Sequence, residues 1–291
     1  MTAGLHERAP AKVNLTLRVL GRRADGYHVL DSLVAFADIG DDISLDPSRA
    51  PGVTVTGPFG GAIGGDDILA RTLELVREAA PQLRLGHVTL DKRLPVASGI
   101  GGGSADAAAL LRLIERANPD AATALDWHGI AARLGADVPV CLGGRATWMG
   151  GIGDVLTPLK QPLPALDVVL VNPLATVPAD KTARVFRALG AGPIDTHAGD
   201  VARGDIPDRA ELIALMRRAG NDLEVPGIAV VPETQAVLDA MEAIGGAELV
   251  QMSGAGPTCF AVLPDAATAR AYAETVRAAQ PAWWIEVARV G

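Results

Sequence analysis

The sequence has few lysines, few aromatic residues and an excess of acidic groups. Lysine occurs at four positions only, Phe, Trp and Tyr together make up 3% of the chain, and the formal net charge is −8 at pH 7. A protein that binds nucleic acid needs a basic face, and it often uses aromatic rings as platforms for bases. We therefore expect no nucleic-acid partner, and any anionic ligand must be held by a few placed cations and by backbone N–H groups.

Cysteines and long apolar runs are scarce as well. Cys141 and Cys259 lie far apart with no paired-cysteine motif, which is typical of buried thiols in a reducing compartment. No apolar run reaches the roughly 18 residues that a membrane-spanning helix needs. The first residues lack the basic, apolar and small-residue blocks of a signal peptide. We expect a cytoplasmic protein that does not enter a membrane.

The length and the order of patterns indicate two α+β domains. The chain has 291 residues, 49% of them hydrophobic, which favours two domains over one. Strand-like and helix-like segments alternate with hairpin-like pairs, so we expect α+β folding in both halves rather than a doubly wound sheet. The segment 160–167 carries two prolines. We place the domain boundary there, giving domains 1–160 and 161–291.

Periodicity predicts the main elements. Alternating apolar and polar residues predict strands, and apolar residues spaced by three and four predict helices. The predicted strands include 11–19 and 87–93, and the predicted helices include 66–80, 104–117, 121–134, 232–244 and 266–279.

A glycine-rich loop, "PVASGIGGGSA" at residues 95–105, separates a predicted strand from a predicted helix. The dinucleotide-binding fingerprint would need glycine where Ser104 stands, and the chain has no Gly-Lys pair, which excludes a Walker A loop. Two readings remain. The loop can cradle an anion at a helix start, with Ser104 as the N-cap or as a hydroxyl that faces phosphate or Mg²⁺. Alternatively, it is a flexible hinge before a capped helix.

Three further segments hold candidate residues. Lys12 and Asn14 lie two apart in a predicted strand, so they share one face, although a lone strand lysine often extends to solvent. Asp137 stands in an apolar stretch before a proline, either as a turn former or as a base in a shaped site. The segment "SGAGPTC" at 253–259 is by itself only a glycine turn between strands.

Four segments in this order resemble the motifs of the GHMP kinase superfamily. They are "PAKVNLTLRVLGRRADGYH", "DKRLPVASGIGGGSADAA", "LGADVPVCLGG" and "MSGAGPTCFAV". The resemblance implies an ATP-dependent small-molecule kinase of two α+β domains. The N-terminal domain would be S5-like, the C-terminal domain ferredoxin-like, and the active site would lie in the cleft between them.

The resemblance also implies roles for individual residues. Asp137 would be the catalytic base, with Lys12 as its cationic neighbour, and Tyr27 and His28 would hold a cytosine ring while Asn14 lies near the acceptor polyol. ATP would be the phosphoryl donor, with Mg²⁺ as its cofactor and with metal ligands left open. The phosphates of ATP would be wrapped by Pro95, Val96, Ala97, Ser98, Gly99, Ile100, Gly101, Gly102, Gly103, Ser104 and Ala105.

The implied reaction is phosphorylation of the 2-hydroxyl of a cytidine diphosphate-linked methylerythritol in isoprenoid precursor biosynthesis. We expect a monomer or a weak homodimer. A relative that acts on homoserine, a sugar or mevalonate is the alternative, but such an acceptor gives no reason for the aromatic "DGYH" segment. A catalytically silent relative would be favoured had Lys12 or Asp137 been lost. Asp106 departs from the family, which often has asparagine there, so we expect it to face away from phosphate or to help hold Mg²⁺.

Overall fold

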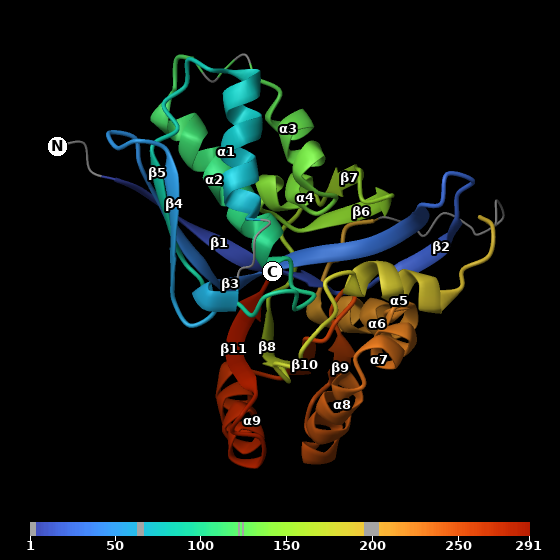
Figure 1. Cartoon of the computed structure of the whole chain (residues 1–291). Coiled ribbons are helices and arrows are strands. Elements are labelled where there is room, and N and C mark those ends of the chain that lie inside the picture. Colours follow the sequence, from blue (N-terminus) through green and yellow to red (C-terminus); the bar gives the residue numbers. More distant parts are fainter. Residues whose placement is uncertain (1–3, 63–66, 122, 124, 195–203) are drawn as a thin grey trace. The chain divides into compact units, whose positions relative to one another are not determined.

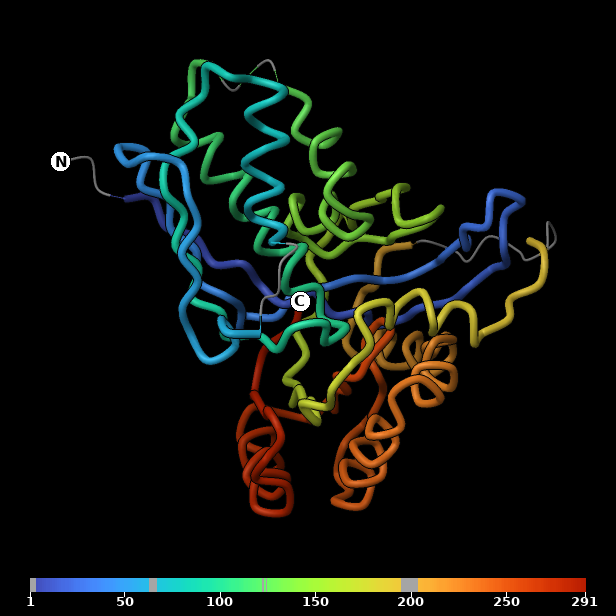
Figure 2. The backbone as a smooth tube through the Cα atoms, viewed as in Figure 1, coloured from blue at the N-terminus to red at the C-terminus, as the bar shows by residue number. Residues whose placement is uncertain are grey.

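The computed structural model describes residues 4–62, 67–121, 123, 125–194 and 204–291. The chain divides into two compact units, each assembled from separate segments, and Figure 2 follows the backbone through them. Unit 1 contains the described parts of Met1–Ala11, Ile39–Val96 and Gly101–Gly144; unit 2 contains those of Lys12–Asp38, Ala97–Ile100 and Arg145–Gly291. The glycine loop thus contributes to both units. The sequence-based division after residue 160 stays a prediction.

Unit 1 contains a mixed sheet. Its strands are β1 (Leu5–Asn14) up to Ala11, the end of β3 (His28–Asp46), β4 (Gly52–Thr56) and β5 (His87–Asp91). β5 pairs antiparallel with β3 and parallel with β4. Ile43 on β3 pairs in register with Leu90 on β5, and Leu45 pairs with Val88. All four side chains are buried. Burial of alternate residues is what the period of a strand predicts.

Four helices pack together in unit 1 (Figure 1). They are α1 (Ile68–Ala79), α2 (Gly102–Ala117), α3 (Trp127–Leu134) and α4 (Val138–Gly143), and a short 3₁₀ turn, Gly60–Ala62, follows β4. α2 contacts each of the other three helices. Its alanine run, 107–109, is fully buried, and such small side chains let neighbouring helices approach closely. The tightly packed α2 therefore gives the glycine loop a rigid end.

Two sequence-based element boundaries in this region were wrong. The strand predicted at 11–19 ends at Asn14, and β2 begins at Arg18, because the Thr16 hydroxyl accepts the Leu33 N–H at 2.9 Å and interrupts the ladder. The helix predicted at 121–134 begins only at Trp127. Its start is set by Asp126, whose carboxylate accepts the Gly129 N–H at 2.8 Å as an N-cap.

Unit 2 is built around an antiparallel sheet with a β-α-β-β-α-β chain order. The elements are β8 (Leu166–Asn172), α8 (Glu233–Ile244), β9 (Leu249–Met252), β10 (Cys259–Leu263), α9 (Ala266–Ala279) and β11 (Trp284–Val290). The strand order is β11-β8-β10-β9. Helices α8 and α9 both pack on this sheet, and Val169, Val171 and Ala261 lie in the core between them. This is the ferredoxin-like arrangement that was expected.

The remaining elements of unit 2 surround this sheet. β2 (Arg18–Arg22) and the hairpin of β6 (Thr147–Gly151) and β7 (Val155–Pro158) extend from the first half of β3. The helices α5 (Lys181–Leu189), α6 (Arg209–Ala219) and α7 (Glu224–Val230) lie between β8 and α8 along the chain. α7 was not predicted, because Pro226 and Gly227 in its interior disguise its pattern.

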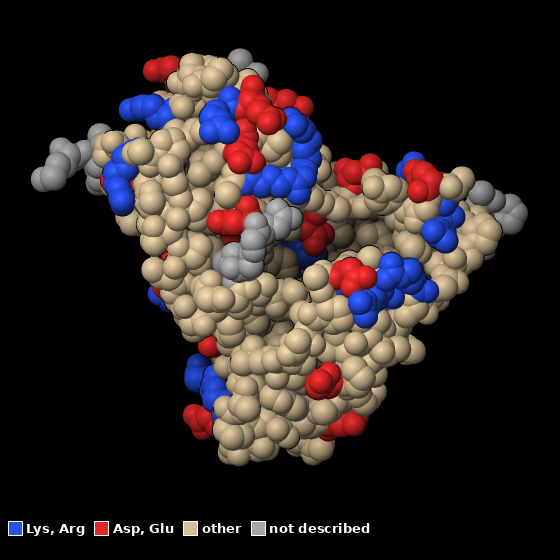
Figure 3. All heavy atoms as spheres, in the orientation of Figure 1, with Lys and Arg blue, Asp and Glu red and all other residues tan. Residues whose placement is uncertain are grey.

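The surface and the helix lengths agree with the composition. On the face shown in Figure 3, the described basic and acidic side chains are interspersed, without one continuous basic field. Of the helices in the described ranges, none combines the length and the apolar character that crossing a bilayer requires.

Candidate active site

Lys12 and Asn14 lie at the end of β1, in unit 2, and both are buried. Lys12 is 4% exposed and Asn14 is 1% exposed. The Lys12 N–H donates to the carbonyl oxygen of Ile100 at 2.9 Å. The solvent-exposed alternative for Lys12 is therefore wrong, and its backbone lies next to the glycine loop.

The Asn14 side chain is part of a polar network. Its Nδ2 donates to Ser32 Oγ at 2.8 Å, and its backbone N–H donates to Ser253 Oγ at 3.2 Å. Asn14 Oδ1 is buried and accepts no hydrogen bond from any described residue. Because an unsatisfied buried acceptor is costly, this oxygen is suited to a donor that arrives with a ligand.

The carbonyl oxygens of the glycine loop are anchored one after another. Those of residues 97 to 100 all accept hydrogen bonds from within unit 2. The donors, in order, are Lys181 Nζ (2.8 Å), the Thr258 N–H (3.0 Å), Ser253 Oγ (3.2 Å) and the Lys12 N–H (2.9 Å). Within the described residues, the backbone N–H groups of residues 97–103 donate to no other group. A loop with bound carbonyls and unused N–H groups is suited to an anion, and its anchoring argues against a free hinge.

The start of helix α2, which follows the loop, is also suited to an anion. α2 begins at Gly102, and the N-cap Gly101 adopts a left-handed conformation with φ 65° and no side-chain cap. Ser104 is therefore not the N-cap but the third residue of the helix, because a left-handed glycine ends the loop two residues earlier than expected. The unpaired N–H groups of a first turn carry a partial positive charge and attract phosphate.

A buried ionic cluster in unit 1 holds the two ends of the loop. Lys92 Nζ lies 2.6 Å from Asp41 Oδ2 and 2.6 Å from Asp106 Oδ2, and none of the three side chains is more than 3% exposed. Asp41 Oδ1 also accepts the N–H groups of Arg93 and Leu94, at 2.6 and 2.8 Å. The cluster thus joins the end of β5 to the second turn of α2.

Two carboxylates, those of Asp41 and Asp106, share the single ammonium of Lys92 in this cluster. Burial and these charges shift the pKa values of Asp106 and Lys92. Burial raises the pKa of Asp106 to about 8, although the Lys92 charge opposes the rise. Burial alone would lower the pKa of Lys92, but the charges of Asp106 and Asp41 outweigh it and the pKa is raised. Burial thus shifts Asp106 toward its protonated form, while the ion pair with Lys92 opposes that shift. The Asp106 side chain faces the buried Lys92, and the two expectations for it, facing away from phosphate or helping to hold Mg²⁺, stay predictions.

Asp137 immediately precedes α4 in unit 1, whereas Lys12 belongs to unit 2. It is half-buried, and its side chain does not cap the helix. The turn is closed instead by the backbone, since the Val138 N–H donates to the Gly135 carbonyl oxygen at 3.1 Å. The backbone, rather than a side-chain cap, therefore closes the start of α4.

Unit 2 contains three aromatic side chains that we call the aromatic group: Tyr27, His28 and Phe186. Tyr27 follows the Asp25-Gly26 turn and is 60% exposed, and His28 begins β3. The His28 ring stacks on Phe186 of α5, with centroids 4.8 Å apart and planes inclined by 24°. Burial, followed by the nearby Arg22 charge, lowers the pKa of His28. The neutral imidazole at pH 7 can both donate and accept a hydrogen bond.

Sequence reasoning did not find several residues of this arrangement. Asp41 carries no local signal, and Ser253 lies in the 253–259 segment found from the sequence, but its contact with Gly99 depends on folding. Phe186 and Lys181 lie on an ordinary amphipathic helix. The scarcity of lysine was the one available signal, since three of the four lysines are buried at the glycine loop or its anchors: Lys12, Lys92 and Lys181.

Comparison with known proteins is consistent with this geometry. The model of the GHMP kinases N terminal domain matches residues 67–145, and that of the GHMP kinases C terminal domain matches residues 198–282. The 4-diphosphocytidyl-2-C-methyl-D-erythritol kinase of Rhodopseudomonas palustris (strain HaA2) is 46% identical over 98% of this chain and 97% of its own length. The chain belongs to the GHMP kinase family. The α+β GHMP kinase fold predicted from the sequence is confirmed.

Solved structures of GHMP kinases agree. A crystal structure of 4-(cytidine 5'-diphospho)-2C-methyl-D-erythritol kinase is 34% identical, with a TM-score of 0.75, and 99% of each chain is covered. The homoserine kinase of Cytophaga hutchinsonii ATCC 33406 is 17% identical with a TM-score of 0.68, covering 100% of this chain and 95% of its own. That second likeness concerns the fold alone.

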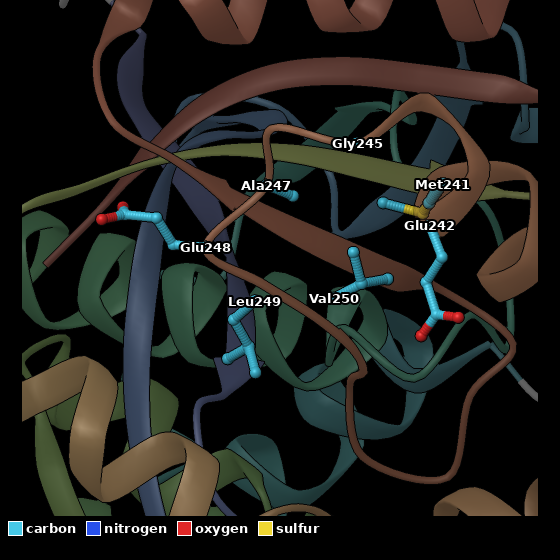
Figure 4. A pocket seen from close by; sticks show the side chains of 7 residues that line it. All are labelled: Met241, Glu242, Gly245, Ala247, Glu248, Leu249 and Val250. Carbon is cyan, nitrogen blue, oxygen red and sulfur yellow. The ribbon is translucent and has the colours of Figure 1, made fainter.

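A small pocket in unit 2 lies away from the predicted site residues. It has a volume of about 240 Å³, and its lining runs from the end of α8 to the start of β9 (Figure 4). Glu242 and Glu248 lie on opposite sides of it, with apolar side chains such as Leu249 and Val250 between them. Two carboxylates at the rim make it unsuited to a nucleotide phosphate.

Proposed function

We propose that this chain transfers the γ-phosphoryl group of ATP to the 2-hydroxyl of 4-diphosphocytidyl-2-C-methyl-D-erythritol. The observation that carries the proposal is the 46% identity over 98% of the chain to a kinase of that name. The anchored glycine loop, the start of α2 and the aromatic group at Tyr27 and His28 supply the features that such a reaction needs. The proposed reaction belongs to isoprenoid precursor synthesis in the cytoplasm. The proposed active form is a monomer or a weak homodimer.

The glycine loop is the proposed binding element for the ATP phosphates. Residues 95–105 offer the unused N–H groups of 97–103 and the positive end of α2. Phosphoryl transfer depends mainly on aligned reactants and on stabilisation of spread negative charge. Backbone donors can supply this in a protein with only 26 basic residues against 34 acidic ones.

Asp137 is the proposed base, and Lys12 is the proposed cation of the reaction. The Asp137 carboxylate takes the proton of the acceptor 2-hydroxyl as that oxygen forms a bond to the γ-phosphorus. The bond between this phosphorus and the β,γ-bridging oxygen breaks, and ADP leaves. A tertiary alcohol is a weak nucleophile at neutral pH, so a positioned carboxylate supplies a route for the proton. Lys12 stabilises the negative charge that develops on the phosphoryl oxygens.

Mg²⁺ is the proposed cofactor. Across the described ranges, no cluster of three or more His, Cys, Asp or Glu side chains could hold a metal on its own. Mg²⁺ is commonly held by one or two protein oxygens together with substrate phosphates, so this donor set fits an ion that is bound with ATP. Ser104, half-buried in the first turn of α2, is the oxygen donor that we assign. The ion would neutralise charge on the β- and γ-phosphates.

The cytosine end of the acceptor is assigned to the aromatic group. Tyr27 and Phe186 offer flat faces, and base–aromatic stacking contributes about 1–3 kcal/mol per base. His28 offers ring nitrogens for the edge of the base. Asn14 Oδ1, a buried acceptor with no partner in the described chain, suits a hydroxyl of the polyol.

The test is ADP release by the purified chain with four acceptors: the cytidyl compound, homoserine, galactose and mevalonate. We expect turnover with the first alone, and turnover with homoserine instead would favour the alternative acceptor class. Asp137→Asn should lower kcat by about 10²–10⁴-fold while the Kd of ATP changes little. Asp120→Asn, at an exposed aspartate, is the matched control and should be neutral. Near-normal turnover of Asp137→Asn would remove Asp137 as the base.

A further inference from the structure

Lys181, the first residue of α5, is a buried cation that forms no ion pair with any described carboxylate. It is 4% exposed, and its Nζ donates to the carbonyl oxygens of Ala97, at 2.8 Å, and of Gly256. In the described part of the chain, no carboxylate oxygen lies within ion-pair distance of this Nζ. Buried lysines are usually paired with an acidic group. Among the described residues, no acidic group neutralises the positive charge of Lys181.

The charged groups on elements packed against Lys181 are bound elsewhere. The neighbouring Asp180 carboxylate pairs with Arg184 at 2.7 Å and with Arg187 at 3.1 Å. On α7, which packs against α5, the Glu224 carboxylate accepts the Met252 N–H at 2.8 Å. None of these groups shifts the pKa of Lys181; burial alone lowers it, to about 8.

The two carbonyl groups that Lys181 binds belong to the two glycine motifs. Ala97 lies in the glycine loop with φ 52°, a left-handed conformation that non-glycine residues rarely adopt. Gly256 lies in the 253–258 loop, which also anchors Ser98 and Gly99. Lys181 therefore binds the Ala97 carbonyl oxygen, as other unit 2 donors bind the carbonyl oxygens of residues 98–100. The N–H groups of the loop remain unused.

We propose that Lys181 is a positioning residue for the nucleotide phosphates. Its ammonium ties the Ala97 carbonyl back against the 253–258 loop and leaves an unneutralised positive charge directly behind the phosphate-binding N–H groups. The inference rests on the proposed function, because it takes residues 97–103 as the site of the ATP phosphates. In a poorly solvated interior, a single charge near a polyanion has a large effect on affinity.

This role has a consequence that a purely structural lysine would not show. About half of the Lys181 side chains are neutral at pH 8, because the pKa is about 8. Bound phosphates favour the charged form and raise the pKa. ATP binding at pH 8 should therefore take up about half a proton at this site, and the uptake should vanish at pH 6, where Lys181 is already charged.

The test is calorimetric titration of the full chain with ATP and Mg²⁺ at pH 6 and pH 8, in buffers of different ionisation enthalpy. We expect Lys181→Met to raise the Kd of ATP by about tenfold or more and to abolish the proton uptake at pH 8. Lys181→Arg keeps the charge at every pH used, so it should retain most of the affinity without the uptake. Lys160→Met, which removes an exposed lysine of the same unit, is the matched control and should behave as the parent.

The outcomes separate this inference from the proposed function. A parent that binds no ATP would overturn both. A parent that binds ATP, with unchanged affinity and proton uptake in the Lys181 variants, would overturn the inference alone. Should Lys181→Met fail to fold, Lys181→Arg decides by the proton uptake: its loss supports the role and its persistence overturns it. ATP binding without transfer to the cytidyl acceptor would overturn the proposed function and leave the Lys181 result standing.

Discussion

Asp106 shows at the scale of one residue how burial changes chemistry. The carboxyl lies against Lys92 and is 2% exposed, and burial raises its pKa to about 8. A group with a raised folded-state pKa contributes stability that is complete below its unfolded pKa of 3.8 and is lost as pH rises through about 8. The parent should therefore lose unfolding free energy relative to Asp106→Asn between pH 5 and pH 8. The slope can reach at most about 1.4 kcal/mol per pH unit.

Urea unfolding of both proteins at several pH values measures this difference. Above pH 8 the two curves should run parallel, because Asp106 is then ionised in both the folded and the unfolded parent. Asn has the same shape as Asp and keeps an acceptor for Lys92, so the variant should fold. Parallel curves over the whole range from pH 5 to pH 8 would mean that Asp106 is ionised throughout and that Lys92 compensates for its burial.

At the scale of elements, the glycine loop depends on its contact with the loop between β9 and β10. Gly99 has φ +84°, and a Cβ there would lie 2.7 Å from the carbonyl oxygens of Gly256 and Ser253. Gly99→Ala should therefore destabilise the chain by at least about 1–2 kcal/mol from the left-handed backbone alone. It should also raise the KM of ATP, since the two loops must separate to admit the methyl group.

Thermal unfolding and steady-state kinetics check this prediction, with Gly143→Ala as the control. Gly143 ends α4, its φ is not in the left-handed range, and a Cβ there would meet nothing within 4 Å. That substitution should leave both quantities close to those of the parent. If Gly99→Ala is as stable as Gly143→Ala and binds ATP equally well, the contact between the loops does not support the phosphate site.

At the scale of the whole molecule, ligand binding should stabilise the fold. A ligand at about 100 times its Kd adds about 2.7 kcal/mol to the unfolding free energy. For a chain of 291 residues, at about 2.1 cal/mol/K of unfolding entropy per residue, this corresponds to a rise in Tm of roughly 4 °C. We expect ATP with Mg²⁺ and the cytidyl acceptor each to raise the Tm, and homoserine to leave it unchanged. Asp137→Asn should keep both shifts, because it removes a proton acceptor rather than a binding group.

A thermal-shift series over ligand concentration makes this measurement. His28→Ala should reduce the shift with the cytidyl acceptor and keep the shift with ATP, because it alters the aromatic group alone. Equal loss of both shifts would show that His28 supports the fold rather than the acceptor. A Tm that does not respond to ATP would contradict the nucleotide site itself.

The sequence by itself determined the features that depend on local chemistry. Helix α1 (Ile68–Ala79) is capped by Asp67 and ends before Pro81, as its pattern predicts, because an N-cap and a proline act on neighbouring residues. For the same reason, the glycine loop was predicted to be either an anion site or a hinge before a helix. The motifs around Lys12, the glycine loop, Asp137 and residues 253–259 resemble those of the GHMP kinases, and this resemblance indicated the family.

Only the tertiary structure decided which distant groups meet. The anchoring of four loop carbonyls by Lys12, Lys181, Ser253 and Thr258 joins segments more than 80 residues apart, and no local pattern encodes such contacts. The raised pKa of Asp106 likewise follows from its burial, with Lys92 and Asp41 beside it. Burial, charge balance and hydrogen-bond partners are set by packing between segments, so they appear only once the chain has folded.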